Sequence, residues 1–204
     1  MHLDFTSSII HAGALVGYIT IFLIIFAESG ILVGFFLPGD SLLFSLGIAA
    51  TQGFPNIWLL ILIGCLAAIL GDSVGYAFGK TAGHTLFTRN DSRFFKKAYL
   101  KRAHTLVEEY GKKAIIIARF TPFVRTFVPV VAGIGEMDYP SFLSFNVIGG
   151  IAWIISISLL GYFLGKVIPN IDRYILPIIG LIIVVSVIPP IREYLKHHKQ
   201  STDS

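Results

Sequence analysis

The sequence Ala118-Arg-Phe-Thr-Pro-Phe-Val-Arg-Thr-Phe-Val-Pro-Val-Val-Ala-Gly133 places two arginines and two prolines in an otherwise apolar stretch. An arginine at the centre of a membrane span costs about 2.5 to 3.5 kcal/mol. Proline removes a backbone donor, and the residue before it avoids the helical conformation. We therefore expect the segment 114–135 to break at Thr121-Pro122 and again at Pro129. Because lipid cannot satisfy the freed backbone groups, the segment is predicted to be a re-entrant hairpin buried in protein or lining a cavity.

The composition around this stretch is that of an all-α integral membrane protein. Of 204 residues, 54% are hydrophobic and only 14% are charged, whereas soluble domains contain roughly 25% charged residues. The mean hydropathy is +0.77, and residues 41–71 and 141–165 contain no charged side chain. Nucleic-acid binding is disfavoured despite an isoelectric point near 9.2, because basic residues of membrane proteins first serve cytoplasmic loops and anionic lipids. The single Cys65 excludes an intrachain disulfide scaffold.

The hydrophobic segments divide into spans and broken segments. A spanning helix needs about 20 apolar residues, and the segments 54–79, 141–165 and 174–191 meet this requirement. The segment of about 9–50 is too long for one crossing and is interrupted at Leu37-Pro38-Gly39-Asp40, which predicts a second re-entrant hairpin. The whole is expected to form one membrane domain, residues 1–191, followed by a tail at 192–204.

The basic residues indicate how the chain is oriented. None precedes Lys80, and the loop 80–113 carries nine. This loop is therefore expected in the cytoplasm. With two re-entrant hairpins, the N-terminus then lies outside and the C-terminal tail, with Arg192, Lys196 and Lys199, lies inside. Residues 9–27 could instead cross completely and place the N-terminus in the cytoplasm, which the charges disfavour without excluding it.

Part of the basic loop has the pattern of an amphipathic helix. Aromatic or aliphatic residues recur at helical spacing between lysines and arginines: Phe95, Tyr99, Ala103, Leu106 and Tyr110. This predicts a helix on the inner membrane surface. Its simplest role is that of an anchor and a topology signal.

Two short matches suggest an internal repeat. Gly75-Tyr-Ala-Phe-Gly-Lys80 and Gly161-Tyr-Phe-Leu-Gly-Lys166 lie 86 residues apart, each at the end of a predicted span. Pro38 and Pro122, which interrupt the two hairpins, lie 84 residues apart. The chain is therefore predicted to consist of two halves, each a hairpin followed by a span. Because the two spans run in opposite directions, the halves would form the inverted repeat typical of many secondary transporters.

Five ionisable residues lie in or near the apolar segments: Glu28, Asp40, Asp72, Arg119 and Arg125. A purely structural interpretation is that the acids of the first hairpin pair with the arginines of the second where the tips meet. Intramembrane charges are also functional candidates by default. Arginine binds phosphate or carboxylate in a bidentate way, so Arg119 and Arg125 are predicted to bind an anionic headgroup. Glu28 and Asp40 are candidates for proton coupling, and Asp72 is a candidate accessory residue.

Other chemistry has little support in the sequence. The histidines show no metal-ligand spacing within a span, so no metal or other cofactor is predicted. The Walker A phosphate-loop motif and the zinc-protease motif His-Glu-x-x-His are missing from the sequence. We therefore expect a protein that is not an enzyme. A lipid-phosphate phosphatase is the weakest of the alternatives.

Three motifs together resemble the DedA family, the bacterial branch of the SNARE-associated, or VTT-domain, membrane proteins. They are Glu28 with Phe36-Leu-Pro-Gly-Asp40, the stretch Gly71-Asp-Ser-Val-Gly-Tyr-Ala-Phe-Gly-Lys80, and the stretch 118–133. The resemblance covers about residues 15–190 and implies an inner-membrane lipid transporter with two opposed re-entrant hairpins. Several members recycle undecaprenyl phosphate, and eukaryotic relatives scramble phospholipids. By motif match, the acids important in the family are Glu28 and Asp40, and its arginines are Arg119 and Arg125.

The expected function is a flippase that returns undecaprenyl phosphate, or a related anionic phospholipid, to the inner leaflet of the bacterial inner membrane. Moving an anion inward opposes an inside-negative potential by about 2.3 kcal/mol per charge per 100 mV, which a cotransported proton would offset. Two alternatives stay open: energy-independent phospholipid scrambling, and a non-transporting scaffold whose charges are structural pairs. The expected partners are the lipid phosphate, protons and membrane lipids; the oligomeric state is open, a homo-oligomer included.

Overall fold

The computed structural model describes residues 2–31, 38–88, 97–121 and 124–168, with side chains described for 13–31, 38–82, 101–121 and 124–168. Within these ranges all the regular secondary structure is helical and there is no strand, which confirms the all-α class. The predicted span 174–191 and the tail 192–204 lie outside the described residues. The helices are α1 (His2–Gly30), α2 (Gly39–Ala49), α3 (Ile57–Thr88), α4 (Lys97–Tyr110), α5 (Ala114–Arg119), α6 (Val124–Ile134) and α7 (Tyr139–Val167), with 3-10 turns η2 (Ala50–Gln52) and η3 (Gly111–Lys113).

Three of the described helices are long and apolar enough to cross a membrane. Their qualifying segments are Gly13–Gly30, Ile57–Ala82 and Tyr139–Val167. The last two correspond to the predicted spans 54–79 and 141–165. However, α3 continues to Thr88, into the predicted loop 80–113, because no proline interrupts the chain after Gly79.

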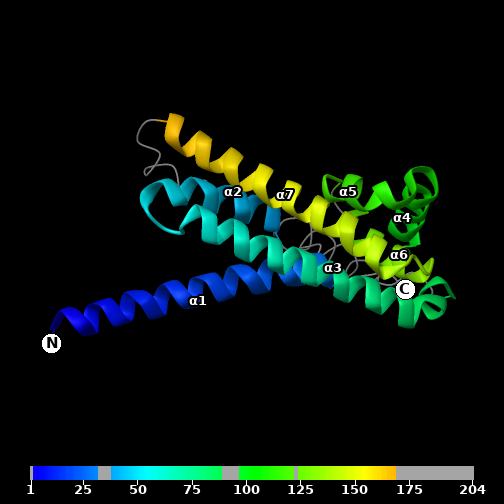
Figure 1. Cartoon of the computed structure of the whole chain (residues 1–204), viewed down its shortest axis with the longest axis horizontal. Helices are drawn as coiled ribbons and strands as arrows, with labels where there is room; N and C mark the ends of the chain where they lie inside the picture. The colour runs from blue at the N-terminus through cyan, green and yellow to red at the C-terminus, as the bar shows by residue number, and fades with distance from the viewer. Residues whose placement is uncertain (1, 32–37, 89–96, 122–123, 169–204) are drawn as a thin grey trace, which may run out of the picture.

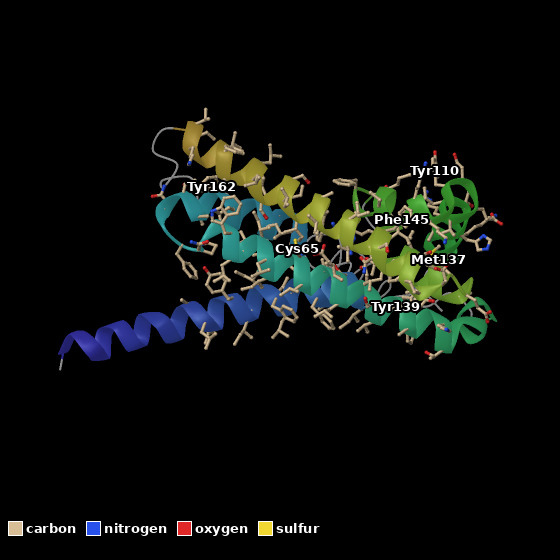
Figure 2. The ribbon with its side chains drawn as sticks, in the orientation of Figure 1. Cys65, Tyr110, Met137, Tyr139, Phe145 and Tyr162 are labelled. Carbon is tan, nitrogen blue, oxygen red and sulfur yellow. The ribbon has the colours of Figure 1, made fainter. Side chains whose placement is uncertain are left out.

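The helices α3 and α7 form a long antiparallel pair, and the N-terminal part of α1 extends beyond one end of it (Figure 1). Their close contacts are at glycines: Gly64 lies against Ile154, and Gly150 lies against Ile69. Figure 2 shows Tyr139 and Tyr162 toward opposite ends of α7, with Tyr162 near the turn that joins α2 to α3. These two helices provide the frame on which the shorter helices pack.

Helices α1 and α2 form a helical hairpin at one end of this frame. The helix α1 runs beside the first half of α3: the amide of Asn56 donates to the Tyr18 hydroxyl at 2.8 Å, and Gly30 packs directly on the backbone of Gly71. The hairpin break begins earlier than expected, because α1 ends at Gly30 and not near Leu37. The second arm of this hairpin begins where the sequence predicts, because α2 starts at Gly39, directly after Pro38.

Helices α5 and α6 form a second hairpin toward the opposite end of the frame (Figure 1). The helix α5 ends at Arg119 and α6 begins at Val124, so the break falls at the expected Thr121-Pro122; residues 122 and 123 lie outside the described part. The second expected break, at Pro129, was wrong, because α6 passes through this residue without interruption.

Pro129 is tolerated within α6 because of what packs against it. It is the sixth of the eleven residues of the helix, so it removes the hydrogen bond that the Arg125 carbonyl would otherwise accept. Its ring packs on α3, within 3.5 Å of where a Cβ on Gly75 would lie. Packing against a glycine thus compensates for the missing hydrogen bond.

The second arm of each hairpin packs on a glycine-rich end of a long helix. On α6, Gly133 contacts the Tyr76 backbone, and Gly79 of α3 contacts Val130. On the other side, Gly47 of α2 contacts the Ser158 backbone, and Gly161 of α7 contacts Phe44. Small residues permit such close backbone approach between membrane helices. Gly47 and Gly133 are separated by 86 residues, the same interval that separates Gly75 and Gly161.

The helix predicted in the basic loop is confirmed over Lys97–Tyr110 as α4. Its apolar face was expected to lie on the membrane surface, but in the structure it packs on protein. Ala103 is fully buried, and Leu106 and Val107 pack with it on the core around α6. This face therefore contacts protein, because α6 presents an apolar surface to it; Lys101 and Arg102 are exposed. Phe95 lies outside the described residues, as does the Tyr99 side chain.

A polar cluster fixes the start of α7. The Asp138 side chain accepts from the Ser141 amide at 3.1 Å and caps the helix. Lys112 donates to Asp138 at 3.1 Å and to the Ser141 hydroxyl at 2.6 Å. Hydrogen bonding from Ser141, followed by that from Lys112, lowers the pKa of Asp138 to about 2. The cap therefore stays ionised at neutral pH and is lost only as the pH falls from the ordinary carboxyl range toward 2.

Candidate functional site

The two hairpins present their charged residues to the middle of the α3–α7 frame. Each of the five ionisable residues singled out from the sequence lies there. Their positions are the last turn of α1 (Glu28), the first turn of α2 (Asp40), the middle of α3 (Asp72), the end of α5 (Arg119) and the start of α6 (Arg125). Because both hairpins are interrupted at this level, residues far apart in sequence meet in one cluster.

Arg125 joins the two acids of the first hairpin. Its Nη1 donates to Asp40 Oδ1 at 2.7 Å, and its Nη2 forms an ion pair with Glu28 Oε1. The three side chains differ in their exposure to solvent: that of Glu28 is 2% exposed, that of Arg125 12% and that of Asp40 44%. Solvent or a ligand therefore reaches the triad from the side of Asp40.

Glu28 and Arg125 each lie at the end of their helix that is electrostatically unfavourable for their charge. Glu28 lies in the last turn of α1, where the helix dipole is negative, and Arg125 lies in the first turn of α6, where it is positive. Glu28 is thus stabilised mainly by Arg125, whereas Arg125 is stabilised by both Glu28 and Asp40. Either residue would gain from a replacement partner of the correct sign once this pair is broken.

Arg119 is held in a separate and fully enclosed set of contacts. Its Nη2 lies 2.6 Å from Asp72 Oδ2 and donates to Asn146 Oδ1 at 2.6 Å. The same nitrogen lies 3.3 Å from the carbonyl of Ala68. Both charged side chains are at most 3% exposed. Arg119 therefore fastens the tip of the second hairpin to α3 and α7, and Asp72 is its principal counter-ion.

Trp153 connects the two sets of charges. Its Nε1 donates to Asp40 Oδ1 at 2.7 Å, and the centre of its ring lies 4.7 Å from the guanidinium carbon of Arg125 and 5.7 Å from that of Arg119. Cation–π attraction is strongest where water is excluded, and Trp153 is only 1% exposed. Trp153 thus contacts Arg119 and Arg125 of the second hairpin and Asp40 of the first.

Asn146 and Trp153 were not predicted as site residues. Asn146 directs its Oδ1 to Arg119 because its own amide donates to the Ile69 carbonyl at 3.1 Å. The available signal was positional: the two residues lie seven apart, two helical turns, in the charge-free segment 141–165. An amide on one face of such a span, two turns from a tryptophan, indicates a polar partner on that face.

The described site contains three carboxyl groups and two guanidinium groups. With all five ionised, its net charge is −1, whereas one proton on a carboxyl makes it neutral. An uncompensated charge is costly where water is excluded. The arrangement can therefore hold a proton at rest, and it can exchange a carboxylate for another anion at Arg125. Within the described side chains, no group of three or more acidic, histidine or cysteine residues is arranged to hold a metal ion.

The fold and this site define a multi-pass, all-helical membrane protein with a buried ionic centre between interrupted helices. A family model described as the VTT domain matches residues 37–163. Protein DedA of Escherichia coli is 42% identical over 184 residues, which cover 89% of this chain and 84% of that protein. The chain belongs to the DedA family of VTT-domain membrane proteins.

Further relatives are consistent with a membrane protein. The inner membrane protein YqjA of Escherichia coli is 38% identical over 149 residues, which cover 73% of this chain and 68% of that protein. An uncharacterized membrane protein of Mycobacterium tuberculosis is 46% identical over 171 residues, which cover 83% of this chain and 74% of that protein. No solved structure matches the chain.

Proposed function

We propose that this chain is a transporter that returns a lipid phosphate from the outer to the inner leaflet of the bacterial inner membrane, coupled to protons. The proposed lipid is undecaprenyl phosphate or a related anionic phospholipid. The observation that carries this proposal is Arg125, which bridges Glu28 and Asp40 at the meeting point of two interrupted helices. No step of the proposed reaction breaks a covalent bond, so the function is transport and not enzymatic catalysis.

We infer that both hairpins are re-entrant and that the two halves form an inverted repeat. In support, Gly30 of α1 lies beside Gly71, midway along the apolar part of α3, so α1 ends near the membrane midplane if α3 spans. The contacts of Gly47 with α7 and of Gly133 with α3, 86 residues apart, further support equivalent halves. With the basic loop in the cytoplasm, the N-terminus then lies outside and the C-terminus inside.

Cysteine labelling tests this topology. In a Cys65→Ser background, Gly13→Cys and Gln52→Cys are expected to react with a membrane-impermeant maleimide applied to the outside. Both positions are exposed and lie near the same end of α3. Lys112→Cys, also exposed, should react only from the inside. Labelling of Gly13→Cys from inside with Gln52→Cys still labelled from outside would instead mean that α1 crosses completely.

The proposed mechanism is an exchange of anions at the arginines. A phosphate entering beside Asp40 forms a bidentate contact with Arg125, with Arg119 adding positive potential from behind. The displaced carboxylate, Glu28 or Asp40, loses its counter-ion and takes up a proton, since an unpaired buried carboxylate is costly. Trp153 keeps the Arg125 guanidinium in place during the exchange. The lipid tail stays in the bilayer while the headgroup passes.

Protons would offset the electrical cost of this transport. Bringing one negative charge inward costs about 2.3 kcal/mol at 100 mV, inside negative. A proton carried on Glu28 or Asp40 cancels that charge movement. The three-to-two ratio of carboxyl to guanidinium groups supports the assignment, because one proton neutralises the resting site.

Transport in liposomes tests the proposed function. Purified protein is reconstituted with fluorescent undecaprenyl phosphate in one leaflet, with and without an imposed pH gradient. Movement to the other leaflet is expected to require the gradient and to be lost in Arg125→Ala, a variant that keeps the Arg119–Asp72 pair. Movement that ignores the gradient, and that includes ordinary phospholipids, would identify a scramblase. If no lipid moves in any of these assays, the transport proposal fails and the scaffold interpretation is favoured.

A further inference from the structure

The Glu28 carboxylate lies against the first residue of α2. A methyl group added at Gly39 would overlap this carboxylate, so the space that a side chain would fill is occupied by Glu28. The helix α2 is eleven residues long and begins at Gly39, and the N-cap residue Pro38 has no side chain that can cap its free amides. A helix start of this kind favours a negatively charged group.

The two oxygens of Glu28 have different partners. Oε1 is paired with Arg125, whereas Oε2 is buried and has no hydrogen-bond partner among the described atoms. A carboxyl group that is 2% exposed normally satisfies both oxygens. Glu28 therefore pairs with the Arg125 guanidinium through one oxygen, and its other oxygen lies beside Gly39 at the start of α2 without a hydrogen-bond partner.

We propose that the first turn of α2 and Arg125 form the headgroup-binding site, and that Glu28 occupies this site at rest as an internal anion that the substrate phosphate displaces. This rests on the proposed function and deepens it by locating the phosphate. A phosphate monoester carries more acceptor oxygens than a carboxylate, so it can bind Arg125 and the α2 amides together. Gly39 is required because only glycine leaves room for an oxygen atom there.

Asp40 is a less suitable internal occupant than Glu28. Its Oδ1 already accepts from both Arg125 and Trp153, and its side chain is 44% exposed. Besides Gly39, the groups facing Glu28 are Arg125 from α6 and Asp40 from α2, while the Thr126 hydroxyl lies 3.5 Å from its backbone carbonyl. Removing the Glu28 charge therefore frees one side of Arg125 while leaving Asp40 in place.

Binding of farnesyl monophosphate to the full-length protein, measured by calorimetry in nanodiscs, tests this assignment. Glu28→Gln is expected to bind at least about tenfold more tightly than wild type, the size of one charge-assisted hydrogen bond. Gly39→Ala should lose binding although both arginines are retained. Gly13→Ala, at a position with open space around it, is the matched glycine control and should bind like wild type.

A double variant separates loss of the site from misfolding. In Glu28→Ala Gly39→Ala the overlapping carboxylate is gone, so the protein should fold, yet the methyl group still fills the phosphate position and binding should stay lost. Wild-type binding in this double variant, or equal affinity in Glu28→Gln and wild type, would overturn the assignment and leave the proposed function intact. Failure of wild type itself to bind would instead count against the proposed function. Inorganic phosphate, titrated in parallel, should bind far more weakly; equal affinity would indicate a site for free phosphate.

Discussion

Arg125→Lys is expected to reduce lipid-phosphate transport at least about tenfold while the protein still folds. Lysine keeps the positive charge but lacks the planar fork that allows Arg125 to contact Asp40 and Glu28 with separate nitrogens. A phosphate would lose the same two-pronged contact, and stacking on Trp153 would weaken. The liposome assay gives the rate, and size-exclusion chromatography gives the folded fraction.

The matched control for this substitution is Arg102→Lys, at an exposed position of α4. Its transport rate should equal that of wild type. A wild-type rate in Arg125→Lys would show that charge alone suffices, which would contradict a bidentate contact with the headgroup.

Arg119→Ala should instead destabilise the fold, by about 3 to 5 kcal/mol, because it leaves the buried Asp72 without a counter-ion. Removing the Asp72 charge as well, in Arg119→Ala Asp72→Asn, should recover part of this loss. The free energy of unfolding in detergent, measured for the two single variants and the double variant, gives the coupling between the residues.

The size of this coupling distinguishes a structural pair from an incidental contact. A coupling of roughly 1 kcal/mol or more is expected for side chains 2.6 Å apart and at most 3% exposed. Additive effects would show that Arg119 and Asp72 do not depend on one another. In that case the fastening of the second hairpin to α3 would have to come from Asn146 and the apolar packing of α6.

The sequence was informative where a residue type has a strong local effect. Arginine and proline in an apolar stretch indicated both an interruption near Pro122 and a buried charge at Arg119 and Arg125, and the described structure confirms the interruption and the burial of Arg119. Pro129 was misjudged because the effect of a proline within a helix depends on what packs against it. That information belongs to the tertiary structure, here to Gly75.

The pairing within the site could not be read from the sequence. The sequence identified the five charges, but their partners depend on where each hairpin ends along α3. Asp72 was considered only an accessory residue, yet it is the counter-ion of Arg119. Trp153 and Asn146 were missed because a tryptophan and an amide in an apolar span are compatible with ordinary packing until their neighbours are known.

The central claim, that a lipid phosphate binds between the hairpin tips at Arg125, is tested most directly by photo-crosslinking. A polyprenyl phosphate with a photoactivatable group beside the phosphate is irradiated with the reconstituted protein, and adducts are mapped by mass spectrometry. Adducts are predicted in the first turn of α2 and the first turn of α6, reduced in Arg125→Lys. Adducts confined to α4 or to the outer surfaces of α3 and α7, unchanged in Arg125→Lys, would contradict the claim.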